Sequence, residues 1–365
     1  MNGKVKDKAD AARDKLADKL PDKLSNKVRK KKAAPLKITN DTIAEHREQI
    51  LAGGRKFKYP LQYSKHKILI NAVAVAVVAV VFFSVWLWVM LYRVQATSDF
   101  FYNTTRILPL PVARVDGEWV RYSDYLRRIR ADIFYYENQE SKNFQTEDGQ
   151  RELDYNKRRE LTATIRAAYA TKIARENNVS VSTAEIDAKI KAQREADNSD
   201  EATLIRMLRA YYNWTLDEYR QTIRDQLLEQ KVAFAIDNPA KERVAKVEER
   251  LRSGEDFAEI AKEVSDDPIA KETGGIMIAR EGDSDGMGLI AAARSLDEGQ
   301  FSGPIASLGR NVDGNYCYFI VKLESKTDSE TRYSVITINL AQFDKDFARL
   351  GEQGKIREFI RVPEL

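Results

Sequence analysis

The sequence contains very few of the side chains that usually carry nucleophilic, redox or metal chemistry. There is one cysteine among 365 residues, Cys317, and a single cysteine excludes an intramolecular disulfide. Cys317 lies in the apolar run YCYFIVKL, which is typical of a buried strand. We therefore expect a structural thiol rather than a catalytic one.

Histidine is nearly as scarce, and its placement matters more than its number. Both histidines, His46 and His66, precede a long apolar segment, and the chain after that segment has none. This excludes Ser–His–Asp and Cys–His nucleophile systems and histidine metal sites from the later part of the chain. Cysteine pairs and glycine-rich phosphate loops are also absent from the sequence. We expect no cofactor and no metal.

Charge is missing altogether from residues 68–91, ILINAVAVAVVAVVFFSVWLWVML. As a helix this segment would reach about 36 Å, enough to cross a hydrocarbon core of about 30 Å. It is too long for a soluble strand, and it begins too far from the N-terminus for a cleaved signal peptide. Trp86, Trp88 and Tyr92 crowd one end, as expected at a membrane–water interface. The pattern predicts a single transmembrane helix over residues 67–92.

The charges before this segment predict its orientation. Residues 1–67 contain 19 basic and 8 acidic residues, whereas the whole chain is nearly balanced at 60 and 56. Lysine and arginine remain on the cytoplasmic side, so we expect the N-terminus inside the cell membrane and the C-terminal domains outside. Residues 1–66 would form a basic cytoplasmic arm and juxtamembrane linker, with Gly53-Gly54 as a flexible point. The arm is expected to approach anionic lipids; nucleic-acid or ribosome binding is the less favoured alternative.

The exported part begins with a linker over residues 93–107 and continues as a mostly helical domain over residues 108–238. VARVDGEWV predicts a β-hairpin, and Ser123 could cap the helix that follows. A polar loop is expected over residues 139–150 and a long helix over residues 153–176. The segments STAE and TLDE, beginning at Ser182 and Thr215, match capping boxes.

The sequence pattern changes at Pro239, and residues 239–365 predict a second domain. LRSGEDFAEIAKEVSDDP suggests two helices separated by Gly254, with Asp256 able to begin the second. Gly274-Gly275 permits a tight reversal before a short strand. A loop, a short helix over residues 289–296 and the apolar strand ending in YFIVKLES follow.

The order of these elements resembles a known family. The hairpin, the long helix ending in RENNVSVSTAEID, and WTLDEYRQTIRDQLL resemble the chaperone domain of SurA/PrsA/PpiD-type foldases. LRSGEDFAEIAKEVSDDP, the Gly-Gly pair, AAARSLDEGQFSGPI and YFIVKLES resemble a parvulin-type peptidyl-prolyl isomerase domain over roughly residues 240–325. The resemblance implies an α+β fold, with a SurA-N-like helical domain followed by a parvulin-like antiparallel sheet with helices.

The parvulin resemblance also implies site residues. Asp267 falls where the family has a catalytic cysteine or aspartate, although Asp-Asp-Pro is equally a good turn sequence. Met287 and Leu289 fall at apolar substrate-pocket positions, and Phe319 falls where a strand histidine is expected. The family's Gly-Gly-Asp-Leu-Gly is here GGIMI, so Ile276 stands in place of its aspartate. These departures imply a slow isomerase or none.

The strand that opens a parvulin domain, with the family's first histidine, has no counterpart before Pro239. The β-rich run RYSVITINL, residues 332–340, could pair with the last strand and fill that place from the C-terminal side. Val335 would then lie near the usual first-histidine position and join the substrate-binding residues. The tail, Phe343–Leu365, is expected to form a short helix and an extended end that pack on this domain.

These observations predict a membrane-anchored foldase or chaperone that binds unfolded or proline-containing exported polypeptides. The alternative is a noncatalytic scaffold, in which the degenerate parvulin module binds a fixed partner at the membrane. The translocation machinery is a candidate partner, and no nucleic acid is expected.

Overall fold

The computed structural model describes residues 39–58 and 60–363 and divides into two units, which meet between Ser84 and Val85. The first contains α3 (Asn40–Lys58) and most of α4 (Pro60–Val89). Of the helices described, Lys67–Val94 is the one long and apolar enough to cross a membrane. The expected flexible point at Gly53-Gly54 is wrong, because both glycines lie inside α3. The basic segment of residues 1–32 lies outside the described residues.

The second unit begins within α4, at Val85. After α4 come a π-helical turn, η1 (Met90–Val94), and α5 (Asp99–Ile107). Phe101, Tyr102 and Thr105 of α5 are buried. The segment assigned to a linker is therefore a folded part of the core, because its aromatic side chains have partners in distant helices.

Five helices and a π-helical turn form the helical part: α6 (Tyr122–Asn138), α7 (Glu147–Glu176), α8 (Thr183–Ala196), α9 (Glu201–Met207), η2 (Leu208–Tyr212) and α10 (Leu216–Ile236). Both predicted capping boxes are present at the starts of α8 and α10. Two boundaries differ from the expectation. Ser123 is buried inside α6 rather than capping it, and α7 begins at Glu147 because Thr146 accepts a hydrogen bond from the Gly149 amide.

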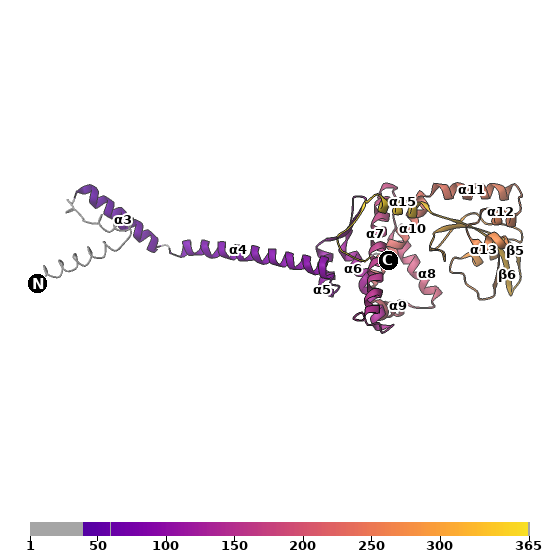
Figure 1. The fold of residues 1–365 in the computed structure, drawn as a ribbon, viewed down its shortest axis with the longest axis horizontal. Coiled ribbons are helices and arrows are strands. Elements are labelled where there is room, and N and C mark those ends of the chain that lie inside the picture. The colour runs from indigo at the N-terminus through magenta and orange to yellow at the C-terminus, as the bar shows by residue number, and fades with distance from the viewer. Residues whose placement is uncertain (1–38, 59, 364–365) are drawn as a thin grey trace. The chain divides into compact units, whose positions relative to one another are not determined.

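A small sheet joins the two ends of the second unit. The predicted hairpin is present as β1 (Pro111–Val115) and β2 (Glu118–Arg121), with positive φ at Asp116 and Gly117. The third strand, β7 (Ile356–Glu358), pairs antiparallel with β1. Helix α15 (Gln342–Glu352) lies beside α7 and α10 (Figure 1), and its Phe343 ring is 5.3 Å from that of Tyr169. The tail therefore packs on the helical part, not on the parvulin-like sheet as expected.

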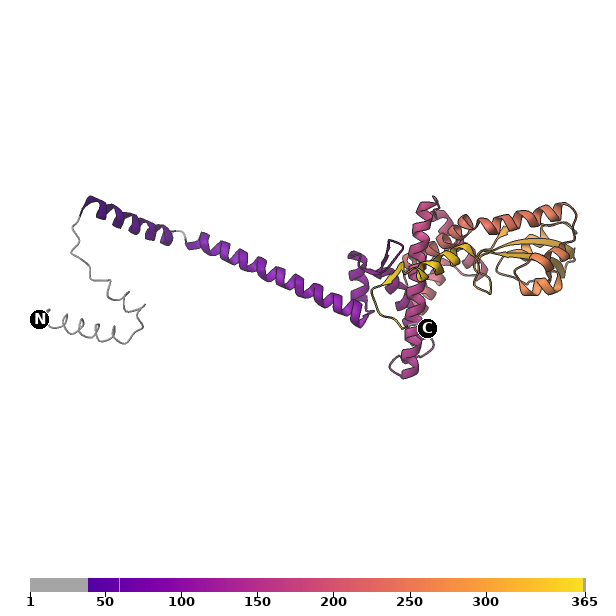
Figure 2. The ribbon, with the colours of Figure 1, turned by 45° about the horizontal axis from the view of Figure 1, so that its top comes forward.

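The parvulin-like part contains α11 (Asn238–Arg252), α12 (Phe257–Val264), α13 (Pro268–Thr273) and α14 (Leu289–Arg294). Its antiparallel sheet has the order β3-β6-β5-β4, with β3 (Ile276–Arg280), β4 (Ile305–Ala306), β5 (Cys317–Lys326) and β6 (Glu330–Asn339). Alternate side chains of β5 and β6 pack with α11 and α12 or with α14, so helices cover both faces of the sheet. Figures 1 and 2 show α11 running along this sheet.

Strand β6 lies inside the sheet rather than at its edge. It pairs with β5 from Cys317↔Asn339 to Lys326↔Thr331, the pairing expected for residues 332–340. It also pairs with β3 on its other edge, and this second pairing was not expected from the sequence. Beyond β3 that edge is completed by Gly275, whose carbonyl accepts from the Val335 amide at 2.9 Å.

Candidate functional site

The four apolar side chains expected to bind substrate lie together on one face of the parvulin-like sheet. Leu289, Phe319 and Val335 are 9%, 6% and 7% exposed, and the partly buried Met287 packs against them. Cross-strand pairing of β5 with β6 and the cover of α14 bring these distant segments together. The structure thus forms an apolar cluster where the resemblance implies a proline pocket, and in this conformation the cluster is closely packed.

Asp285, which was not among the expected site residues, holds Met287 and Leu289 in place. The Asp285 carboxylate accepts hydrogen bonds from the amides of Met287, Gly288 and Ile290, at 2.8, 2.6 and 2.6 Å. These bonds satisfy the unpaired amides at the start of α14 and fix the approach of the preceding loop. The sequence feature that could have indicated this role is the position of Asp285, four residues before the apolar helix α14.

Polar side chains share the sheet face with the cluster, among them Cys317, Tyr333 and Thr337. Burial raises the pKa of the Cys317 thiol to about 12, so the thiol stays protonated at neutral pH and is a poor nucleophile. Burial, followed by the charges of Asp285 and Asp283, raises the pKa of Tyr333. Its phenol therefore stays protonated and can donate a hydrogen bond.

The Ser265-Asp266-Asp267 segment has a clear structural role. Asp267 is half-buried, and its carboxylate caps α13 by accepting from the Ala270 amide at 2.9 Å. Asp266 binds the Arg243 guanidinium through both oxygens at 2.8 Å and accepts from the Asn339 amide at 2.7 Å. The Ser265 hydroxyl accepts from the Thr337 amide at 3.1 Å. This segment therefore completes the edge of β6 beyond the end of β3, and a catalytic role for Asp267 stays a prediction.

Two adjoining cavities lie between the helical part and the loop that follows β4. One, of about 460 Å³, lies between α7, α8, α10 and the loop at Leu308–Arg310. The other, of about 690 Å³, is lined by Val179, Phe234 and Ala306, and Gln230 and Leu308 line both. The combined lining mixes apolar side chains with amides and charges.

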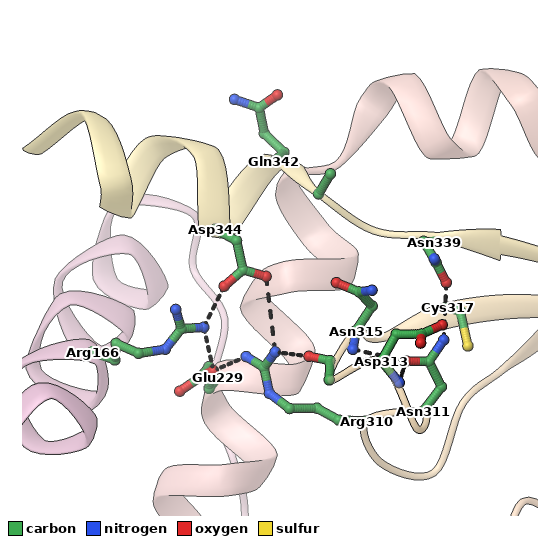
Figure 3. Close-up of polar contacts among 12 residues, drawn as sticks. Arg166, Glu229, Arg310, Asn311, Asp313, Asn315, Cys317, Asn339, Gln342 and Asp344 are labelled. Carbon is green, nitrogen blue, oxygen red and sulfur yellow. Dashed lines mark hydrogen bonds and ion pairs between the residues drawn. The ribbon is translucent and has the colours of Figure 1, made fainter. Parts of the chain in front are cut away.

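A network of four charges holds this loop beside the helices (Figure 3). Glu229 of α10 forms ion pairs with Arg166 of α7, at 3.0 Å, and with Arg310 of the loop. Asp344 of α15 lies 2.6 Å from Arg166 and 3.8 Å from Arg310. The Arg310 guanidinium also stacks over the Tyr316 ring at 4.5 Å. The network joins four segments that are far apart in sequence.

Metal chemistry has no candidate site in the part of the chain that the structure describes, because no three His, Cys, Asp or Glu side chains there are grouped to hold an ion.

Comparison with known proteins identifies both parts. Residues 62–233 match the SurA-like N-terminal domain family, and residues 227–325 match the PPIC-type PPIase domain family. A foldase protein PrsA from Clostridium kluyveri is 32% identical over 120 residues, covering 32% of each chain. Foldase protein PrsA 4 from Bacillus cereus is 39% identical over 93 residues, covering 24% of this chain and 29% of that one.

A crystal structure of PrsA from Bacillus subtilis aligns at 21% identity over 53% of this chain and 75% of that chain. The TM-score of this alignment is 0.19.

The domain order defines a class of proteins in which a helical SurA-like domain precedes a parvulin-type domain. In the order of its two matched domains this chain is similar to proteins of the SurA/PrsA type. It spans about a third or less of the length of the curated relatives it matches.

Proposed function

We propose that this chain is a membrane-anchored extracytoplasmic foldase that binds unfolded exported polypeptides, with weak or absent prolyl isomerase activity. The observation that carries the proposal is the pair of adjoining cavities between the helical part and the loop after β4. A PrsA-type domain order supports the same class of function.

The lining of these cavities suits an unfolded chain. Leu308 is 54% exposed although it is a large apolar residue, and Phe234 and Val179 add apolar surface nearby. Exposed apolar surface of this kind marks sites where proteins bind other chains. Gln193, Gln226 and Gln230 lie in the lining of the first cavity. Gln193 accepts from the Tyr219 hydroxyl and Gln230 donates to the Ser307 carbonyl, and the remaining amide groups can pair with the backbone of a client.

Weak catalysis follows from the composition of the apolar cluster. Isomerisation must cross a barrier of about 18–20 kcal/mol, and lowering it requires donors that support the twisted amide. Phe319 and Val335 stand where the family resemblance implies histidines, and both are buried in the cluster. Tyr333 is one polar donor that this face supplies.

We also propose that β6 takes the place of the strand that opens a parvulin domain. The PPIase match begins at residue 227, which lies in α10, and it ends at residue 325, before β6. A helix therefore occupies the start of the match, while β6 pairs along the length of the last matched strand. The parvulin-like domain would begin at about residue 239 and include residues 332–340.

Anchoring by α4, with the N-terminus in the cytoplasm, is the third part of the proposal. Its support is the uncharged stretch of α4 and the excess of lysine and arginine before it. The protein should resist carbonate extraction, and external protease should digest the C-terminal domains while sparing the N-terminal arm. Digestion of the arm alone would contradict the orientation.

Aggregation of an unfolded reporter protein, measured with full-length protein in neutral micelles, tests the chaperone function. Leu308→Asp should weaken suppression, because it places a charge in the shared lining. Val312→Asp is the matched control, since Val312 is fully exposed in the same loop and lies outside both linings. Equal effects of the two variants would contradict the binding site.

A proline-peptide assay run beside it addresses catalysis. Suppression without isomerisation supports pure chaperoning. Absence of both would leave the scaffold function, with a fixed partner at the membrane.

A further inference from the structure

The second unit is joined to the apolar helix without an intervening linker. Leu87 and Leu91, at the end of α4 and in η1, are buried in its core. The Trp86 ring lies 5.6 Å from that of Phe101, and the Tyr122 hydroxyl donates to the Leu91 carbonyl. If α4 crosses a membrane, the surface of this unit around η1 must lie at the membrane–water interface.

A cavity of about 270 Å³ opens at this place, and we call it the interface pocket. Its lining residues come from η1, the segments beside it and the C-terminal tail: Trp88, Tyr92, Arg93, Gln95, Phe359 and Arg361. Gln95 has a left-handed backbone conformation, and its side-chain amide donates to the Arg361 carbonyl at 2.6 Å. The Tyr92 hydroxyl donates to the Pro111 carbonyl at 2.7 Å. These bonds fix the two walls of the pocket against each other.

Among the residues that the structure describes, the guanidinium groups of the pocket have no carboxylate partner. Neither Arg93 nor Arg361 forms an ion pair with another described residue, and Arg93 instead lies 5.6 Å from the Trp88 ring. Acids of α5, of the β1–β2 hairpin and of β7 pair with cations of other elements, in the pairs Asp99–Arg130, Asp116–Lys172, Glu118–Arg175 and Glu358–Arg158. The pocket therefore holds two positive charges that no described carboxylate neutralises.

Exposed apolar rings continue outward from the interface pocket. Trp119 is 56% exposed, its ring lies 6.1 Å from that of Phe359, and Arg114 stacks over it at 4.9 Å. Phe100 is 50% exposed beside Trp86. Aromatic rings mixed with arginine are the composition favoured at the level of lipid headgroups.

We propose that the interface pocket binds the phosphate of a phospholipid from the membrane that α4 enters, and thereby docks the second unit on the bilayer surface. Guanidinium groups bind phosphate oxygens through paired donors, and the aromatic walls suit the glycerol region beside them. This inference rests on the proposed membrane anchoring, because continuity with α4 selects a lipid as the source of the phosphate.

The first test titrates full-length protein in neutral micelles with short-chain phosphatidylglycerol or with glycerol phosphate. The lipid should bind saturably, and Arg93→Gln/Arg361→Gln should weaken binding about 30-fold. Arg280→Gln/Arg332→Gln is the matched control, because it removes the same charge from exposed arginines of the parvulin-like sheet and should leave binding unchanged.

Equal binding of glycerol phosphate would assign a free-phosphate site, and equal weakening by the control would assign nonspecific attraction. Either result, or the absence of binding, overturns the proposal.

The second test measures docking with a nitroxide on Trp119→Cys in nanodiscs containing phosphatidylglycerol. Cys317 is buried and should not react, so an introduced cysteine can be labelled selectively. The label should be more accessible to oxygen and less accessible to a polar nickel reagent than a label on Val312→Cys. Equal accessibility would overturn the proposed docking. Carbonate extraction reports anchoring separately, and the aggregation assay reports chaperoning, so the three failures are distinguishable.

Discussion

The two adjacent aspartates of the SDDP segment, Asp266 and Asp267, should contribute unequally to the free energy of unfolding. Asp266 accepts charge-assisted bonds from Arg243 and an amide bond from Asn339, whereas Asp267 caps a six-residue helix. Asp266→Ala should lower the free energy of unfolding by about 2–4 kcal/mol, and Asp267→Ala by about 1 kcal/mol. Urea unfolding of the full-length variants measures both. Loss of isomerisation in Asp267→Ala with unchanged stability would instead support a catalytic role.

The Asp132 carboxyl gives the protein a defined pH dependence. Burial, followed by the nearby Glu160 charge, raises its pKa to about 7 despite the ion pair with Arg159. Between about pH 4 and pH 7 the unfolded chain releases this proton while the folded chain keeps it, so stability falls as pH rises through that window. Asp132→Asn should therefore gain about 2 kcal/mol over wild type between about pH 5 and pH 8. Thermal unfolding at both pH values measures this, and a parallel pH profile of the two proteins would contradict it.

The sequence was sufficient to select the side chains of the apolar cluster but not the groups that position them. Met287, Leu289 and Phe319 were identified because the resemblance assigns roles by position along the chain. Asp285 and Tyr333 were missed because their roles depend on loop conformation and cross-strand neighbours, which local patterns do not encode.

At the scale of elements, the close approach of residue 275 to β6 requires a glycine at this position. Its φ is +82°, and an added Cβ would lie 2.3 Å from the Val335 carbonyl oxygen. Gly275→Ala should cost about 3 kcal/mol or more of unfolding free energy, since it adds a backbone clash to the left-handed strain. Gly282→Ala is the control, because Gly282 has φ +85° with open space around it and should cost about 1 kcal/mol. Similar losses in both would show that β6 moves easily away from Gly275.

Local signals predicted elements well, and long-range pairing accounts for the errors. The hairpin turn at Asp116-Gly117 and both capping boxes follow from side chains within four residues of each other. The strand β7 pairs Ala113 with Glu358, and the packing of α15 on α7 joins Tyr169 with Phe343, so both depend on contacts between residues far apart in the sequence that no local pattern predicts. The residues of α5 form a core helix for the same reason.

At the scale of the whole second unit, the network around Glu229 links the cavities to the C-terminal helix. Glu229→Gln and Arg310→Gln should each destabilise the loop after β4, and the double variant should cost about 1–2 kcal/mol less than the sum of the single changes. The reason is that both changes remove the same ion pair. A double-mutant cycle on unfolding free energy measures the coupling, and additive losses would show that the pair contributes little.

Capture of an unfolded chain by the cavities is the central claim. A photoreactive benzoylphenylalanine at Leu308 of the membrane-bound full-length protein should crosslink an unfolded client and not its folded form. The same group at Val312 should give little crosslinking, because that side chain is fully exposed and lies outside both linings. Equal crosslinking at the two positions, or capture of the folded client at Leu308, would contradict the account.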